Sequence, residues 1–159
     1  MSLETGAVLT VQEGLRVPGG RATFEADLTR LAQALARSAR RPVWLGVALV
    51  DDAVIRVTNA EHLDHDWATD VISFPMAEAP RIEGELMISA DTARREASER
   101  GHSPYHELML YAVHGGLHLL GYDDHNASDR RRMRAAERRV LARLGLPAVF
   151  GRGRASPGA

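Results

Sequence analysis

The chain has no cysteine among its 159 residues, and this absence limits the chemistry open to it. Disulfide bonds and thiolate metal sites are excluded, so a bound metal would have to rest on histidine and carboxylate side chains. The lack of cysteine also fits a cytoplasmic location, which we expect, because disulfides belong mainly to oxidising compartments. Lysine is absent too, since all twenty basic residues are arginine. We give that choice no functional weight.

Long apolar runs are also missing. No stretch is long enough to span a bilayer, and residues 1–4 (Met-Ser-Leu-Glu) do not begin a basic and then apolar signal peptide, so we expect no membrane contact. The composition, 45% hydrophobic and 26% charged, is that of an ordinary globular protein. The length predicts one domain, which we place at residues 1–150. Residues 151–159, rich in glycine, arginine and proline, are expected to form a disordered tail.

The net charge of −1 conceals an asymmetry between the two parts of the chain. Residues 126–159 contain nine arginines and two acids, whereas residues 1–125 contain eleven arginines and nineteen acids. A basic cluster of this kind is typical of a nucleic-acid-binding surface. It is equally typical of a solvated helix face that has no partner. Charge alone therefore leaves both interpretations open.

Short β-branched segments and amphipathic segments alternate along the chain, which predicts an α+β fold, an α/β-like sandwich around one small sheet. Pro75 should stop the third strand, and residues 76–83 read as a loop. Thr23 and Ser128 are the expected N-caps of the first and last helices. The predicted strands are 8–17 (broken at Gly14), 43–50, 70–74 and 85–89, and the predicted helices are 24–39, 53–62, 91–100, one beginning at Ser103-Pro104, and one beginning at 128.

The helix that begins near Pro104 carries two histidines four residues apart. On a helix this spacing places His114 and His118 on one face, one turn apart, where both imidazoles can bind a single zinc ion. Gly121 then lets the chain leave the helix in a left-handed conformation. Beyond that turn, Asp124 or His125 can return as a third ligand. Three protein ligands leave one tetrahedral position for water, which is the arrangement of catalytic zinc sites.

At these residues the chain resembles the YbeY family, bacterial metal-dependent endoribonucleases that act in ribosomal RNA maturation. That family carries His-x3-His-x5-His within a His-Gly-x-Leu-His-Leu-Leu-Gly-Tyr-Asp-His string, and residues 114–125 here read His-Gly-Gly-Leu-His-Leu-Leu-Gly-Tyr-Asp-Asp-His. Two further family-like strings stand upstream, Thr-Asp-Val-Ile-Ser-Phe-Pro at 69–75 and Gly-Glu-Leu-Met-Ile-Ser at 84–89. The resemblance spans roughly residues 28–146.

The resemblance implies a mixed, mainly four-stranded sheet, with a metal cleft at the end of a central helix. It implies cleavage of single-stranded RNA, maturation of the 16S ribosomal RNA 3′ end and ribosome quality control, with ribosomal RNA and the small subunit or its associated proteins as partners. The expected cofactor is one Zn²⁺ per chain, with Mn²⁺ or Mg²⁺ as alternatives. His114, His118 and Asp124 are the expected catalytic and metal-binding residues. Nothing in the sequence predicts an oligomeric state.

The chain departs from the family pattern at the third ligand. After His118 and five intervening residues the family has histidine, whereas this chain has Asp124, followed by His125. A carboxylate oxygen also binds zinc, and Gly121 keeps its place, so we favour Asp124 and hold His125 as the alternative. A carboxylate donor would also make manganese or magnesium more acceptable.

A second departure concerns the substrate. The family often has a Tyr-Arg pair before the Thr-Asp-Val string, and an ungapped alignment places His62 and Leu63 there. The arginine expected to face the phosphate is therefore missing. Arg56 is a candidate replacement, since charge stabilisation is a large catalytic term. Asp66, Asp70 and Ser73 complete the candidate substrate-binding residues, although a structural role is the first interpretation of the last two.

Two other classes of function remain open. A zinc metalloprotease with the His-Glu-x-x-His motif uses glutamate after its first histidine, and here that residue is Gly115. Such a protease would need a base from elsewhere. The missing arginine favours the other class, a ribosome assembly factor that uses its metal only structurally. Metal binding and RNA binding without cleavage would identify it.

Overall fold

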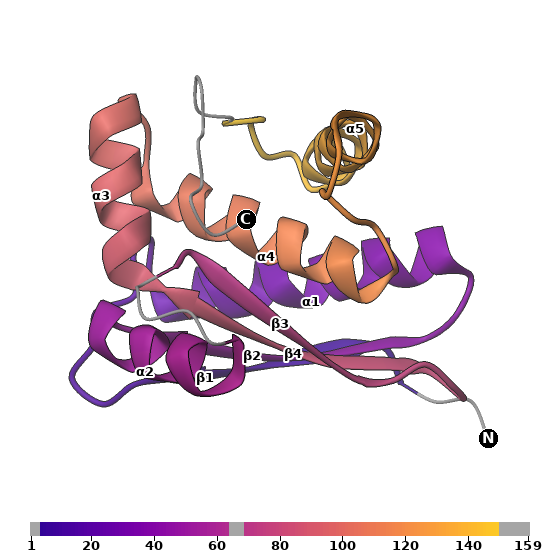
Figure 1. Cartoon of the computed structure of the whole chain (residues 1–159), viewed down its shortest axis with the longest axis horizontal. Coiled ribbons are helices and arrows are strands. Elements are labelled where there is room, and N and C mark those ends of the chain that lie inside the picture. The colour runs from indigo at the N-terminus through magenta and orange to yellow at the C-terminus, as the bar shows by residue number, and fades with distance from the viewer. Residues whose placement is uncertain (1–3, 64–68, 150–159) are drawn as a thin grey trace.

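The computed structural model describes residues 4–63 and 69–149, and these residues form one four-stranded sheet with helices on both faces (Figure 1). The strand order is β1-β2-β4-β3, where the first three of these strands run parallel and β3 runs antiparallel to β4. The predicted α+β class and mixed four-stranded sheet are therefore confirmed. The strands are β1 (Gly6–Val11), β2 (Val43–Val50), β3 (Val71–Ala77) and β4 (Ile82–Ser89).

The five helices of the described part form layers around this sheet (Figure 1). α1 and α4 cover one face, α5 packs on the outer side of α4, and α3 stands against α4 at one end. α2 lies on the opposite face of the sheet. The helices are α1 (Arg21–Ala39), α2 (Asp52–Leu63), α3 (Ala90–Arg100), α4 (Pro104–Leu119) and α5 (Ala127–Arg143).

α4 is the central helix of the core. Every residue from 108 to 113 is completely buried, which suits a helix that is apolar on all sides. On the sheet, alternate residues of β2 turn toward α1 and α4: Val43, Leu45, Val47 and Leu49 are buried there. Because the middle of α4 is fixed by this packing, the residues of its last two turns are held in place as well.

The strand predictions needed correction at β3. This strand runs through Pro75 to Ala77 rather than stopping at the proline, and the predicted loop 76–83 is shorter, since β4 begins at Ile82 and only residues 78–81 connect the two strands. Pro75 lies opposite Gly84, and a register shift follows it. β3 is an edge strand, where a proline is tolerated because one side of the backbone has no ladder partner. The first strand ends at Val11, earlier than predicted.

The two predicted N-caps were wrong. α1 begins at Arg21, directly after Gly20, so Thr23 lies inside the helix. α5 begins after Asn126, whose side-chain oxygen accepts a hydrogen bond from the Asp129 N–H at 2.8 Å. Asparagine is as good an N-cap as serine, and it stands earlier in the chain. Among the described helices, none combines the length and apolarity needed to cross a membrane. The predicted tail at 151–159 lies outside the described residues.

Candidate metal centre

The C-terminal end of α4 brings the two predicted histidines together. The helix starts at Pro104 after the cap Ser103, whose side-chain oxygen accepts a hydrogen bond from the Tyr105 N–H. It ends at Leu119, and Gly121 then takes a φ of 101°, as its role in leaving the helix requires. The chain turns back there, because the Tyr122 N–H donates to the Leu117 carbonyl at 3.1 Å.

This turn places Asp124 beside both histidines. The Nε2 atoms of His114 and His118 lie 3.1 Å apart, and their rings are nearly perpendicular, at 83°. Oδ2 of Asp124 lies 3.5 Å from Nε2 of His114 and 3.7 Å from Nε2 of His118. Three potential ligand atoms from the end of one helix and the turn that follows it, residues 114–124, thus form one compact triangle.

The triangle has the dimensions that a tetrahedral zinc ion requires. Metal–nitrogen distances of ~2.0–2.1 Å and tetrahedral angles put neighbouring ligand atoms ~3.3–3.4 Å apart. The three observed separations lie close to this value. The side chains are 18–28% exposed, so the cluster borders solvent on one side, where a fourth ligand can enter. One carboxylate and two imidazoles suit zinc, and they also accept manganese.

Glu137 of α5 stands behind His114. Its Oε2 lies 3.7 Å from Nδ1 of His114, and its side chain is only 6% exposed. Burial by itself would lower the pKa of His114, but the hydrogen bond to Asp124 and the carboxylate of Glu137 outweigh it and raise that pKa to about 9. A carboxylate at Nδ1 holds the proton on that nitrogen, which leaves Nε2 to face a metal.

The other two candidate ligands titrate in the directions that metal binding needs. Burial, with the charge of His114, lowers the pKa of His118. The hydrogen bond with His114 is the main cause that lowers the pKa of Asp124. At neutral pH, His118 is therefore neutral and Asp124 is ionised, which are their metal-binding forms.

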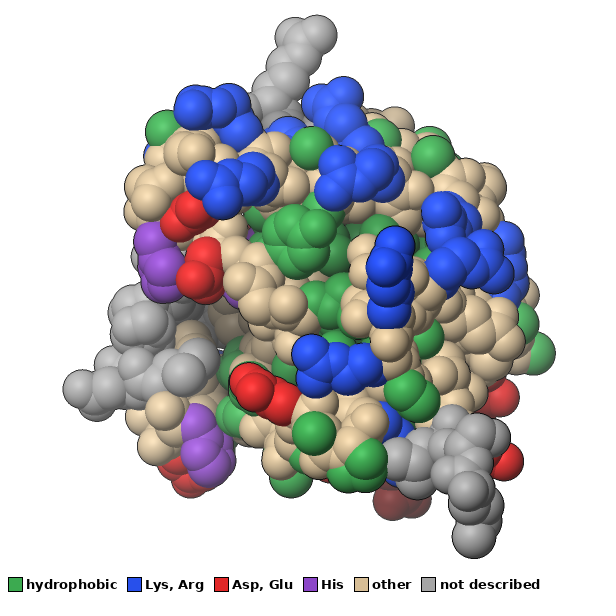
Figure 2. Space-filling view, turned by 90° about the vertical axis from the view of Figure 1, so that its right-hand side faces the viewer, with side chains coloured by type: hydrophobic (Ala, Val, Ile, Leu, Met, Phe, Trp, Pro, Cys, Tyr) green, Lys and Arg blue, Asp and Glu red, His purple; other side chains and the backbone are tan. Residues whose placement is uncertain are grey.

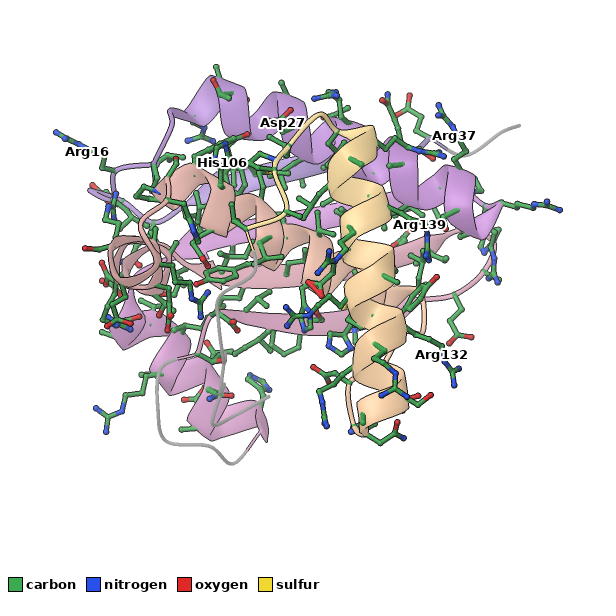
Figure 3. The ribbon with its side chains drawn as sticks, turned by 90° about the horizontal axis from the view of Figure 1, so that it is seen from above. Arg16, Asp27, Arg37, His106, Arg132 and Arg139 are labelled. Atoms are coloured by element: carbon green, nitrogen blue, oxygen red, sulfur yellow. The ribbon has the colours of Figure 1, made fainter. Side chains whose placement is uncertain are left out.

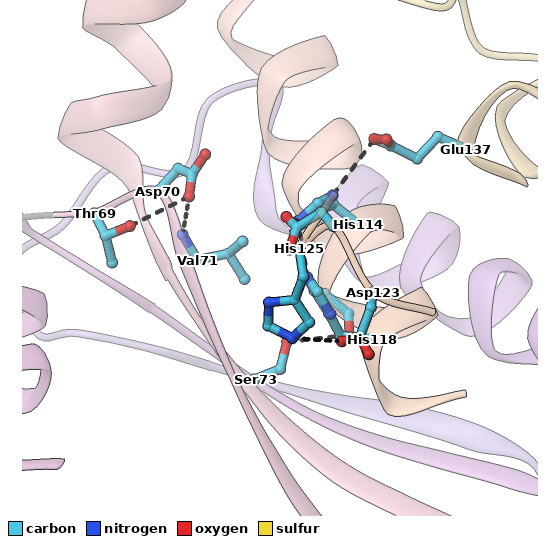
Figure 4. Close-up of polar contacts among 11 residues, drawn as sticks. Thr69, Asp70, Val71, Ser73, His114, His118, Asp123, His125 and Glu137 are labelled. Carbon is cyan, nitrogen blue, oxygen red and sulfur yellow. Dashed lines mark hydrogen bonds and ion pairs between the residues drawn. The ribbon is translucent and has the colours of Figure 1, made fainter. Parts of the chain in front are cut away.

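His125, the alternative third ligand, lies outside this triangle. Its side chain is 78% exposed, and its Nε2 lies 3.4 Å from Oδ1 of Asp123 (Figure 4). The group of closely spaced ligand atoms among the described residues contains Asp124 and not His125. The arrangement therefore favours the aspartate.

The candidate substrate-binding residues are dispersed. Oδ1 of Asp70 accepts a hydrogen bond from the Val71 N–H at 2.8 Å, and the Ser73 hydroxyl donates to the Gly115 carbonyl at 3.1 Å (Figure 4). Both contacts help to seat β3 and fit the structural interpretation. Arg56 is an exposed residue of α2, across the sheet from α4. Asp66 lies outside the described residues.

Gly115 is required by close packing between α4 and the sheet. A Cβ atom at this position would lie 2.9 Å from Cδ2 of Leu86 and 3.1 Å from Oγ of Ser73 and from Cγ2 of Val71. A side chain there requires these neighbours to shift. The observed packing therefore disfavours a protease whose glutamate base occupies this position.

Sequence reasoning missed Glu137. The signal was present, because Met133, Ala136 and Val140 mark the buried side of α5, and Glu137 stands among them at helical spacing. An acid on the apolar side of a helix is rarely buried without a partner. In this case the partner is a histidine of the candidate metal centre.

Comparisons with known proteins agree on one family. The model of the family described as Endoribonuclease YbeY matches residues 19–145. A relative named Endoribonuclease YbeY from Rhodopirellula baltica is 48% identical over 105 residues, which cover 64% of this chain and 54% of the relative. The protein of the same name from an Anaeromyxobacter species is 39% identical over 141 residues, covering 87% of this chain and 73% of the relative.

The chain spans only a little over half the length of several of these curated relatives, 54% and 58% for two of them. A solved structure also matches, the solution structure of TM1509 from Thermotoga maritima. Its TM-score is 0.62 at 20% identity, and the match covers 92% of this chain and 99% of the other. At that identity the likeness concerns the fold.

Proposed function

This chain belongs to the Endoribonuclease YbeY family, and on that basis we propose that it is a metal-dependent endoribonuclease that cleaves single-stranded RNA. The resemblance in its motifs predicted this family, and the family model confirms it. The proposed setting is cytoplasmic ribosomal RNA maturation, including the 16S 3′ end and ribosome quality control. The proposed partners are ribosomal RNA and the small subunit or its associated proteins.

The observation that carries the proposal is the triangle of His114, His118 and Asp124, which has zinc-like spacing and borders solvent. A zinc ion bound there, or manganese or magnesium in its place, would lower the pKa of water toward ~7 and polarise a phosphoryl oxygen. His114 and His118 would each present Nε2, and Asp124 would present Oδ2. Glu137 would keep the Nδ1 proton of His114 and fix the direction of that ring.

The proposal is tested by metal analysis and RNA cleavage on the same samples. The purified protein is assayed with an end-labelled single-stranded RNA and with a duplex of the same sequence, with zinc, manganese, magnesium or a chelator. We expect about one metal per chain, cleavage of the single strand and loss of cleavage with the chelator. The His114→Ala variant should lose metal and cleavage together.

His106→Ala is the matched control, because His106 lies on the same helix but toward its other end (Figure 3). It should keep both metal and cleavage. Stoichiometric metal in His114→Ala would contradict the ligand assignment. Bound metal and bound RNA without cleavage under any of these ions would instead indicate a ribosome assembly factor. Peptide cleavage would indicate a protease, which the packing at Gly115 disfavours.

A further inference from the structure

A pocket of about 170 Å³ lies between α1 and α5, with α4 beneath it. Its floor is apolar and includes Leu117 and Val140, while Arg37, Arg139 and Arg143 line it from the two outer helices. Figure 3 shows Arg37 on α1 and Arg139 on α5 on the same side of the molecule. Three guanidinium groups around one hollow form a site for an anion.

These three arginines lack the counter-charges found elsewhere on the surface. Within residues 4–63 and 69–149, the guanidinium groups of Arg37, Arg139 and Arg143 form no ion pair or hydrogen bond. By contrast, Arg30 on α1 is paired with Asp27 at 2.8 Å. Arg139 and Arg143 stand four residues apart on one helix, where like charges destabilise the helix. The unbalanced charge is therefore available to a ligand.

The pocket shares one lining residue with each of two neighbouring hollows. Tyr122 lines it and also lines the hollow that includes Asp123 and Arg132, directly beside the candidate ligand Asp124. On the other side, Arg37 also lines a hollow with Arg40 and Arg41. Arginines of α5 and α1 thus line the pocket and the hollow next to it at the end of α1. We name Arg143, Arg139, Arg37, Arg40 and Arg41 the arginine track.

Figure 2 shows arginines gathered over this side of the molecule; the blue side chains are all arginine, since the chain has no lysine. One residue of the arginine track, Arg40, has an unfavourable backbone conformation. Arg40 ends α1 with a φ of 56°, and it is the single non-glycine residue of the described segments with a positive φ. A left-handed conformation is unfavourable for a residue with a Cβ, and glycine would avoid that strain.

We infer that the arginine track binds the sugar–phosphate backbone of the RNA strand that flanks the cleaved bond. This inference rests on the proposed function, because it assumes that a single strand enters the metal centre. Guanidinium groups bind phosphate oxygens in bidentate fashion and read no sequence. A chain of phosphates fits charges spread over neighbouring hollows better than a compact acidic patch does, and Tyr122, which lines the pocket, stands two residues before the candidate ligand Asp124.

The test measures binding of a fluorescent 12-nucleotide oligouridylate to the metal-containing protein over a range of salt concentrations. A denaturing gel checks that the probe stays intact. Each lost phosphate contact should reduce the slope of log K against log salt by ~0.7 and the affinity about fivefold at ~0.1 M salt. We therefore expect Arg37→Gln and Arg139→Gln each to weaken binding about fivefold, and the double variant about 25-fold.

Two controls keep the result specific. Arg16→Gln removes one exposed arginine at the opposite end of the molecule and should bind RNA like the unchanged protein (Figure 3). The double Arg37→Lys/Arg139→Lys variant keeps the charges and should keep the salt slope. Thermal unfolding of every variant shows whether it is folded, which exposed substitutions should not prevent.

An unchanged affinity and salt slope in the folded Arg37→Gln/Arg139→Gln variant would overturn the inference and leave the track to another partner, such as an acidic protein. An equal loss in Arg16→Gln would also overturn it, because the effect would then come from net charge. A failure of the proposed function can be distinguished from a failure of this inference. If the proposed function is wrong and the track is right, RNA binding still depends on Arg37 and Arg139 although no metal ion supports cleavage.

Discussion

Oε2 of Glu137 on α5 lies 3.7 Å from Nδ1 of His114 on α4, so a buried carboxylate stands behind one of the three candidate ligands. The two residues are twenty-three positions apart and meet only because α5 packs across the end of α4. Such a carboxylate orients the imidazole and raises its basicity toward a metal. The first prediction concerns this pair.

Glu137→Gln should lower the metal affinity by ~10–100-fold, the usual effect of removing a carboxylate behind a ligating histidine. Competition with a chromophoric chelator measures this. Glu61→Gln, the same substitution at an exposed residue of α2, should leave the affinity unchanged. If the two variants bind metal equally well, Glu137 does not orient His114.

The identity of the third ligand can be tested by comparing two adjacent alanine variants. Asp124→Ala should weaken metal binding by ~100-fold or more, because it removes a ligand rather than a group behind one. His125→Ala should change it little, since its side chain is 78% exposed and lies next to Asp123. The reverse order of effects would assign the third ligand to His125.

Metal binding should be strongly dependent on pH. The pKa of His114 is raised to about 9 in the metal-free protein, because Asp124 and Glu137 together outweigh burial. A metal must displace this proton, so the apparent affinity should fall ~tenfold for each pH unit below that pKa. Titrations at several pH values measure the slope, and a flat profile between pH ~6 and pH ~8 would contradict the account.

The stability of the metal-free protein should change with pH in the opposite direction to the metal affinity, falling as the pH rises. A histidine with a raised pKa contributes stability that is complete below its ordinary pKa of 6.5 and is lost as the pH rises toward about 9. Chelator-treated protein should therefore lose the contribution of His114 over this interval, while the metal-bound protein gains from tighter binding. Urea unfolding at the two ends of the interval, with and without metal, tests both signs.

Gly115→Ala should destabilise the fold. Overpacking costs ~1–3 kcal/mol, and the ~1 kcal/mol by which alanine is the better helix former offsets only part of it. Gly116→Ala is the matched comparison: its new Cβ would crowd a single side chain, at 2.7 Å from Cδ1 of Leu35, whereas the Cβ at Gly115 would crowd three different side chains. Urea unfolding should rank Gly116→Ala as the more stable variant, and the opposite ranking would show that the sheet yields at this contact.

The sequence was sufficient to predict the fold class and the close placement of His114 and His118, because both follow from local spacing. An apolar stretch around residues 108–113 predicts a buried helix, and a four-residue interval predicts one shared face. The residues at which the strands and helices begin and end were harder to predict. Pro75 would end a central strand, and only the sheet order shows that β3 lies at the edge.

Contacts between distant segments were not predictable from spacing. The choice between Asp124 and His125 depends on how the turn after Gly121 folds back, which the φ of 101° and the Tyr122 hydrogen bond decide. Glu137 reaches His114 through the packing of two helices. The arginines of α1 and α5 meet for the same reason, although the basic character of the C-terminal part was visible in the sequence.

The contact at Gly115 also limits which other reactions could be engineered into this fold. Grafting a carboxylate next to the first histidine is the shortest route on paper from this centre to a peptidase. Here, however, the first carbon of that side chain would have to fit where the glycine has only a hydrogen atom, between Leu86, Ser73 and Val71. Those three side chains would have to shift or be replaced by smaller ones first, so the change of chemistry requires coordinated substitutions on the sheet.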